Sequence, residues 1–490
     1  MRSLTLIALF FVFASPAWWS PSAMAASEAE EKRTLAGNRK LSYQVSPPSV
    51  GDWRKILSEG VYYGRVRTNF FRWNWEDENG ASRDSHSILG AGGSLIYRTA
   101  QWQGLSADLG LYVTTNPLFR PDRDEVGELK AGKDVISRYE VSRGGSYHEV
   151  VPGQANLSYA ADGFELRAGR QLYESAFTAS NDTKMIPNTF DGVTGEWQAA
   201  ERTRVRFAWL DRQKLRDHTE AHDVITFRNA AGESWANQDD SAIHKGLSYA
   251  NFRAAGESTS HDLWIGSLSH RFANDLNVVA SGLVLPEVLN QAVIELGYSR
   301  EIGDWRLKPG LRYFHQFDEG GGAIGGASLD GDVNSGAPGG YRDPDQLDAS
   351  LLGLRLVLDN PDRSVQTLIG YTRVADDADI VAPWRSFPTG GYTRAMGQYN
   401  WRADTDSYLL QFKFDFEKLA RIKGLDGMLR YARMDFDEGK GYTDREILHL
   451  DFIQQFTALP GFELRLRAAF VTDDGPTDYQ EYRLETNYLF

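Results

Sequence analysis

The feature that most constrains this chain is a two-residue alternation of apolar and polar side chains, repeated in segments of about ten residues from position 61 to the end. In 103–114, Leu105 and Leu109 share one face while Asp108 lies on the other, and 462–471 repeats the pattern. Successive side chains of a strand point to opposite faces. Each segment therefore predicts a strand with one apolar face and one polar face.

Membrane-spanning helices are excluded by hydropathy. No apolar run of about 18 residues follows residues 1–25. A chain that enters a membrane without such helices does so as a closed β-barrel, because only closure pairs every backbone polar group.

The connections between the segments alternate between short and long. Tight turns are predicted at 161–163, 303–304, 361–363 and 459–461, whereas 115–152, 215–260, 318–346 and 376–405 are long and polar. A barrel with an even strand number and both ends in the periplasm places its short turns there. The predicted fold class is all-β: a transmembrane antiparallel β-barrel of about 18 strands, with short periplasmic turns and long extracellular loops.

The beginning of the chain has the pattern of a secretory signal. Arg2 supplies a positive charge, residues 4–14 are apolar, and Ala23-Met24-Ala25 has the small-residue spacing of a cleavage site. We therefore predict a cleaved signal peptide over residues 1–25.

The remainder divides into two parts. Residues 26–60 are charged and turn-rich, and we predict a mobile periplasmic N-terminal lead-in there, followed by an outer-membrane β-barrel over 61–490. The chain ends on Phe490, and a terminal aromatic on a closing strand is similar to the insertion signal of outer-membrane barrel proteins. We expect Phe490 to be recognised by the barrel-assembly machinery.

Composition excludes some functions and directs attention to the barrel interior. The net charge of −14 argues against nucleic-acid binding, and the absence of cysteine excludes thiolate chemistry and disulfides. Many cations nevertheless alternate with apolar neighbours, and because arginine at mid-membrane depth costs about 2–4 kcal/mol, we expect them to face the lumen. The predicted pore-lining basic residues are Arg65, Arg67, Arg204, Arg206, Arg306, Lys308, Arg312, Arg355, Lys413, Arg465 and Arg467.

Two interpretations of these cations stay open. They pair with lumenal carboxylates and only stabilise a wet barrel, or they pass carboxylate-bearing solutes from one guanidinium to the next. Both hold together without contradiction. A barrel of about 18 strands leaves an aqueous channel, so we expect conduction under either interpretation.

The connection from Gln171 to Gly192 is predicted to fold inward and constrict the lumen, because it is rich in small polar residues. An ordinary surface loop is the alternative. The predicted constriction residues are Tyr173, Ser175, Phe177, Ser180, Asn181, Asp182, Lys184 and Asn188.

Several short motifs resemble those of one known family. They are Gly169-Arg170-Gln171, Ile186 to Phe190, Gln213 to Thr219 and His222-Asp223-Val224, together with Asn69-Phe70-Phe71 and the terminal Phe490. This set resembles the OprD-type, or Opr, substrate-specific porins of Gram-negative outer membranes. The resemblance implies an 18-stranded barrel with one pore per chain, often a loose homotrimer, in outer-membrane lipid and lipopolysaccharide. It also implies a basic ladder and an inward loop that select small carboxylate-containing nutrients.

We therefore expect a non-enzymatic outer-membrane porin for passive, partly selective diffusion of small anionic or zwitterionic solutes, with no cofactor or metal. One alternative is a receptor or adhesin barrel with a closed lumen. Another is an outer-membrane hydrolase, but Ser269 and His270 point to opposite faces of a strand, and His449 with Asp451 lacks a nucleophile.

A metal site at His218 and His222 stays open. Their i, i+4 spacing suits a divalent metal on a helical turn, but they fall in an expected external loop, where such residues often only order the chain.

Overall fold

The computed structural model describes residues 33–78, 85–126, 129–130, 132, 135–216, 218–228, 244–331, 339–396, 400–475 and 478–490. The predicted signal peptide, 1–25, and Asp217 lie outside the described residues.

No helix in the described part of the chain is long and apolar enough to cross a membrane.

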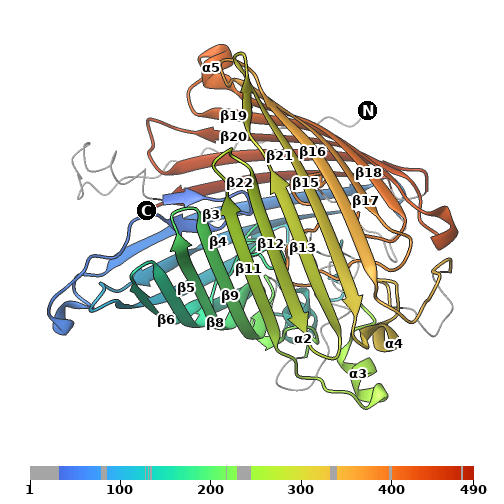
Figure 1. Ribbon diagram of the computed structural model, residues 1–490, viewed down its shortest axis with the longest axis horizontal. Coiled ribbons are helices and arrows are strands. Elements are labelled where there is room, and N and C mark those ends of the chain that lie inside the picture. The colour runs from blue at the N-terminus through green and yellow to red at the C-terminus, as the bar shows by residue number, and fades with distance from the viewer. Residues whose placement is uncertain are drawn as a thin grey trace.

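The chain forms one closed antiparallel barrel (Figure 1), which confirms the predicted fold class. Neighbouring strands follow chain order, and the last strand closes on the first with Leu489 opposite Arg65. The wall consists of β3 (Val61–Trp75), β4 (His86–Arg98), β5 (Leu105–Leu118), β6 (His148–Ala161), β7 (Phe164–Gln171), β8 (Thr189–Ala200), β9 (Thr203–Lys214), β10 (His222–Asp223), β11 (Leu263–Arg271), β12 (Asn277–Leu285), β13 (Leu289–Gly297), β14 (Arg300–Ile302), β15 (Trp305–Asp318), β16 (Ala349–Asp359), β17 (Val365–Val374), β18 (Thr405–Asp415), β19 (Leu425–Asp435), β20 (Arg445–Gln455), β21 (Phe462–Asp473) and β22 (Tyr479–Leu489). Among the described residues β13 and β14 form one interrupted strand against β15, and β10 is a two-residue addition to β9, so the wall has 18 strands.

The two ends of the barrel differ, as the alternation of short and long connections predicts. Helices α2 (Arg138–Gly144), α3 (Tyr249–Ala255) and α4 (Gly321–Gly325) gather at the end with the long loops, and α5 (Phe416–Ala420) lies at the other (Figure 1). We call these the long-loop end and the short-turn end. In one tight turn Gly303 adopts a φ of 57°, which glycine accepts without strain.

Strand β18 is shorter than the alternation in its sequence. Apolar residues alternate through Phe416, but β18 ends at Asp415, whose side chain accepts a hydrogen bond from the Lys418 backbone N–H at 3.1 Å. This contact makes Asp415 the N-cap of α5. A carboxylate three residues before the backbone N–H that it accepts from thus ends the strand and begins a helix.

The outer face of the wall is apolar. Leu109, Leu157 and Ile369 leave more than half of their surface exposed, whereas Asp108, on the opposite face of β5, is 3% exposed. These positions follow the predicted alternation. The exposed apolar band is the surface that lipid would cover.

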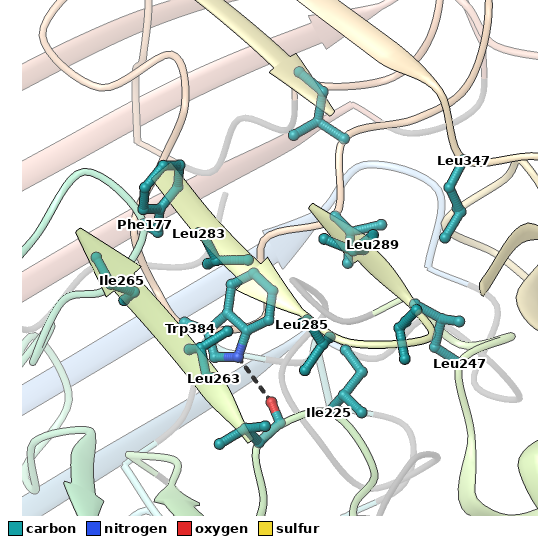
Figure 2. Packing of buried hydrophobic residues seen from close by; sticks show 14 of the residues in the cluster. Phe177, Ile225, Leu247, Leu263, Ile265, Leu283, Leu285, Leu289, Leu347 and Trp384 are labelled. Atoms are coloured by element: carbon teal, nitrogen blue, oxygen red, sulfur yellow. Dashed lines mark hydrogen bonds between the residues drawn. The ribbon is translucent and has the colours of Figure 1, made fainter. Parts of the chain in front are cut away.

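The inner face is not uniformly polar, contrary to the simple alternation. Leu263 and Ile265 of β11 and Leu283 of β12 point inward and pack with loop residues in one buried cluster (Figure 2). Trp384 lies in its centre and donates from Nε1 to the Val224 carbonyl oxygen at 2.8 Å. Long loops therefore fold into the barrel and are held there by an apolar core, which two-residue periodicity alone does not reveal.

The lead-in before the barrel also differs from expectation. Residues 49–60 lie at the short-turn end of the barrel. There the Ala100 backbone N–H donates to the Ile56 carbonyl oxygen at 3.0 Å. Ahead of them, β1 (Arg33–Leu35) and β2 (Leu41–Tyr43) form an antiparallel hairpin. Leu41 is buried against β3 and β4, so this part of the predicted periplasmic segment lies inside the barrel.

Candidate functional site in the barrel lumen

The lumen contains a cavity of about 1200 Å³ that reaches the short-turn end. Wall strands, the 172–188 loop, the 375–404 loop and the tip of the β1–β2 hairpin border it. Its described lining carries ten arginines and one lysine against five carboxylates. The basic lining residues are Arg206, Arg216, Arg312, Arg363, Arg385, Arg394, Lys413, Arg430, Arg465, Arg467 and Arg483. The cavity is therefore basic although the chain as a whole is acidic.

Three inward residues of β3 hold the 172–188 loop across the lumen. Arg65 and Arg67 both pair with Asp182, with 2.9 Å between Arg67 Nη1 and Asp182 Oδ1. Asn69 donates from Nδ2 to the Lys184 carbonyl oxygen at 2.9 Å. All five residues are buried. The loop is therefore clamped to the wall by a dry ion-pair network.

The other side of this loop borders the cavity. Arg216 donates to Asn181 Oδ1 at 3.2 Å and to Thr183 Oγ1 at 2.7 Å, which fixes two polar side chains beside the cavity. The loop residues that line the cavity are Glu174, Ser175, Ala176, Ala179, Asn181 and Thr183. The 172–188 loop is thus an inward loop with a buried side and a cavity side.

A second inward loop, 375–404, lies against the first. Thr178 and Arg385 form an antiparallel bridge, and the Ala179 backbone N–H donates to the Trp384 carbonyl oxygen at 3.0 Å. Ser386 Oγ donates to the Ala176 carbonyl oxygen at 2.6 Å. The two loops therefore contact each other inside the barrel, and both border the cavity.

A buried carboxylate anchors the second loop. Asp379 accepts hydrogen bonds from the backbone N–H groups of Leu329 (2.9 Å) and Ala403 (2.7 Å) and from the Tyr341 hydroxyl (2.8 Å). Burial raises the pKa of Asp379, while Arg402 and these donors oppose the rise. The contacts join three segments of the long-loop end around one side chain.

Two arginines of the wall meet an aromatic ring of this loop. Arg312 and Arg355 lie 4.6 and 4.8 Å from the centre of the Tyr392 ring. Arg312 also pairs with Glu295, whereas Arg355 has no ion pair with a described residue and donates to the Gly391 carbonyl oxygen at 3.4 Å. Cation–π contact of this kind orients a guanidinium without neutralising it.

Strands β18 and β19, a short way along the same wall, add two more cations. Lys413 of β18 and Arg430 of β19 border the cavity, and neither forms an ion pair with a described residue. Arg430 donates from Nε to Gln411 Oε1 at 2.9 Å. His449, opposite Arg430 in the register, is 5% exposed, and neither of its ring nitrogens has a hydrogen-bond partner. Lys413 and Arg430 place their charges beside the cavity, whereas the ring nitrogens of His449 are buried.

A family model described as the OprD family of outer membrane porins matches residues 151–490. This chain belongs to the OprD family. Comparison with curated protein sequences finds no match.

Solved structures share the fold of this porin. Pseudomonas aeruginosa OccK9 (OpdG) matches with a TM-score of 0.68 and 17% identity, over 89% of this chain and 99% of that one. Pseudomonas aeruginosa OpdK, solved with vanillate, matches at 0.65 and 15%, over 89% and 99%. Acinetobacter baumannii OccAB4 matches at 0.66 and 15%, over 88% and 98%. Family and fold identify a channel of the Gram-negative outer membrane and not an enzyme.

The cations predicted to line the pore fall into several groups in this OprD-family porin. Those that border the cavity are Arg206, Arg312, Lys413, Arg465 and Arg467, and those that do not are Arg65, Arg67, Arg204, Arg306, Lys308 and Arg355. Most of both groups have carboxylate partners. The pairs and their distances are Arg204–Glu196 (3.2 Å), Arg206–Glu196 (3.4 Å), Arg306–Glu301 (2.6 Å), Lys308–Asp359 (2.6 Å), Arg465–Asp451 (2.8 Å) and Arg467–Glu485 (3.4 Å).

The residues predicted for the constriction divide in the same way. Ser175 and Asn181 border the cavity. Tyr173 and Phe177 instead pack into the apolar cluster of the porin. The predicted residues that are buried among polar contacts are Ser180, Asp182, Lys184 and Asn188.

Sequence reasoning did not single out several lining residues of the porin. Arg430 and Arg483 alternate with apolar neighbours and could have been found by the rule that gave Arg465. Arg385 and Arg394 could not, because they come from a loop expected to lie outside. The Arg394 guanidinium lies 3.2 Å from the centre of the Phe387 ring, and no local sequence pattern predicts that contact.

Two groups with metal-binding residue types are accounted for by other contacts. Asp376, Asp404 and Asp437 lie close together, but Lys440 Nζ lies between two of them, 2.5 Å from both Asp376 and Asp437. His218 Nδ1 and His222 Nε2 are 2.7 Å apart and form a hydrogen bond with each other.

Proposed function

We propose that this porin gives passive, partly selective diffusion to small carboxylate-containing nutrients through its basic lumen. The observation that carries the proposal is the pair Lys413 and Arg430, which borders the cavity without a carboxylate partner among the described residues. A cation that is already paired with a wall carboxylate binds an anionic solute weakly. Lys413 and Arg430 have no such partner among the described residues and can bind the solute.

The chemistry favours a carboxylate. A guanidinium binds a carboxylate through two parallel N–H donors, and an ammonium adds a mobile third contact. Several such groups, each of moderate strength, let an anion bind and leave again. OpdK, a structural relative, was solved with vanillate, which is itself a carboxylate.

Polar and cationic groups that border the same cavity support a route for such a solute. Ser175 and Asn181 of the 172–188 loop line this cavity together with Arg312, Lys413 and Arg430. Polar loop atoms hold the hydroxyl groups of the solute while the cations hold its charge.

The test compares two solutes of the same size in proteoliposomes. Gluconate and sorbitol share a polyol chain of equal length but differ in charge. In Lys413→Gln/Arg430→Gln we expect gluconate influx to fall about tenfold or more, because each lost charged contact costs about 1.5–3 kcal/mol, while sorbitol influx stays near that of the wild type. Arg204→Gln is the matched control, since Arg204 is paired with Glu196 and does not border the cavity.

Two other outcomes would contradict the proposal. Equal loss for both solutes would mean that the cations shape the pore without selecting charge. No influx of either solute through the folded wild-type barrel would favour the closed-lumen receptor.

A further inference from the structure

The β1–β2 hairpin carries the chain into the lumen before the wall begins. Tyr43 stacks on Tyr63 of β3 with ring centres 5.0 Å apart, and Leu41 is buried in the same cluster. The hairpin therefore docks on the inner face of the wall. Its turn, residues 37–40, extends to the cavity, where Gly37 and Asn38 are lining residues.

Arg39 fastens this turn to the wall. Its guanidinium pairs with Glu463 of β21 and with Glu485 of β22, the latter at 2.7 Å, and Arg65 donates to its carbonyl oxygen at 3.0 Å. Arg39 is 3% exposed. A side chain from outside the barrel wall thus completes a buried ion-pair network within it.

Asn38 joins the turn to the constriction. Its Nδ2 atom donates to both carboxylate oxygens of Glu174, at 3.1 and 3.0 Å, and lies 3.3 Å from Ser180 Oγ. Lys40 Nζ lies 4.0 Å from the same carboxylate. Glu174 is a cavity-lining residue of the 172–188 loop, so the turn contacts the loop where the loop borders the cavity.

We propose that residues 37–40 are a third side of the constriction, beside the two inward loops, and that they set the width of the lumen and the position of Glu174. Arg39 is a positioning residue in this arrangement, and Gly37 and Asn38 face the solute path. The inference rests on the proposed function, because the turn affects selectivity only if solutes pass through the lumen.

Cysteine labelling tests whether the turn faces the ion path. The chain has no cysteine, so one introduced thiol is unique. A Cβ at Gly37 meets no atom within 4 Å. In Gly37→Cys we expect a bulky thiol-reactive sulfonate to cause a stepwise loss of single-channel conductance in potassium chloride.

Gly51→Cys is the matched control. A Cβ there also meets no atom within 4 Å, but Gly51 is exposed and does not border the cavity, so labelling should leave conductance unchanged. Labelled Gly37→Cys with undiminished conductance would overturn the inference. A channel that loses current on labelling yet passes gluconate and sorbitol alike would overturn the proposed selectivity alone.

A second pair of variants tests the role of Arg39. Arg39→Gln removes both ion pairs, and we expect larger mean conductance and more open-channel noise as the turn leaves the wall. Arg39→Lys keeps the positive charge, so its conductance and open-channel noise should lie closer to those of the wild type. The heat-modifiable gel shift reports whether each barrel is folded. A folded Arg39→Gln with wild-type conductance and noise would contradict the positioning role.

Discussion

Arg65 and Arg67 lie on the inward face of β3, yet neither borders the cavity, because Asp182 draws both guanidinium groups under the 172–188 loop. Arg430 lies on an equally inward face and has only an amide and a backbone carbonyl as partners. The same residue type therefore has different roles in the two environments. A carboxylate neighbour turns a lumenal arginine into an anchor, and its absence leaves the charge for a solute.

Removal of the shared carboxylate should release the loop. Asp182→Asn leaves two buried guanidinium groups without their ion-pair partner in the loop, and loss of one partner from a buried pair costs about 3–5 kcal/mol. We expect a large fall in the temperature at which the folded band disappears in the heat-modifiable gel shift. Glu165→Gln, which breaks the half-exposed pair with Arg167, should cost about 1 kcal/mol or less. Equal effects would mean that Asp182 is not the anchor.

At the residue scale, two-residue alternation predicts which face of a strand a side chain lies on. Arg206, Arg312 and Arg465 alternate with apolar neighbours and border the cavity. Whether an inward cation is paired depends on which carboxylate reaches it from another strand or loop. Asp182 lies more than a hundred positions from Arg65, and no local pattern links the two.

At the scale of elements, the wall strands were predictable, whereas the inward direction of the 375–404 loop was not. The turn residues and the two-residue period locate the strands to within a few positions. The 375–404 loop enters the barrel because Trp384 and its neighbours complete an apolar core with the inward faces of β11 and β12. Such packing joins segments far apart in the chain, so polar composition alone wrongly indicates an outside loop.

The long-loop end has an anchor that should respond to acid. Asp330 pairs with Arg402 at 2.9 Å and lies 3.2 Å from the Tyr442 hydroxyl and 3.5 Å from Lys245 Nζ. Burial would raise the pKa of Asp330, but Arg402, Lys245 and Tyr442 hold it below its ordinary value of 3.8. A carboxylate with a lowered pKa contributes stability above its unfolded pKa, and that contribution is lost as pH falls through the folded pKa.

We therefore expect loop fluctuations to begin only below the ordinary pKa of an aspartate, about 4. Open-channel noise in planar bilayers should rise in that range, since protonated Asp330 no longer holds Arg402. Asp330→Asn should show the raised noise at neutral pH and little further change in acid. Constant noise in the wild type throughout the same range would exclude Asp330 as the loop anchor.

At the scale of the whole molecule, the net charge of −14 and the basic lining of the cavity predict opposite ion preferences. The distance over which each charge acts decides between them. Exposed loop carboxylates are screened within about 10 Å at 0.1 M salt, whereas an ion in the lumen lies beside the lining cations. The local field should therefore prevail over the net charge.

The reversal potential in a potassium chloride gradient measures this balance. We expect an anion preference in the wild type, and it should weaken as ionic strength rises, because added salt screens the lumenal cations as well. Lys413→Gln/Arg430→Gln should reduce the preference or abolish it, since it removes two lining cations that form no ion pair with a described residue. Arg306→Gln, a change at a cation paired with Glu301 away from the cavity, should preserve the preference. A cation-selective wild-type channel would mean that the five lining carboxylates, and not the cations, govern the ion path.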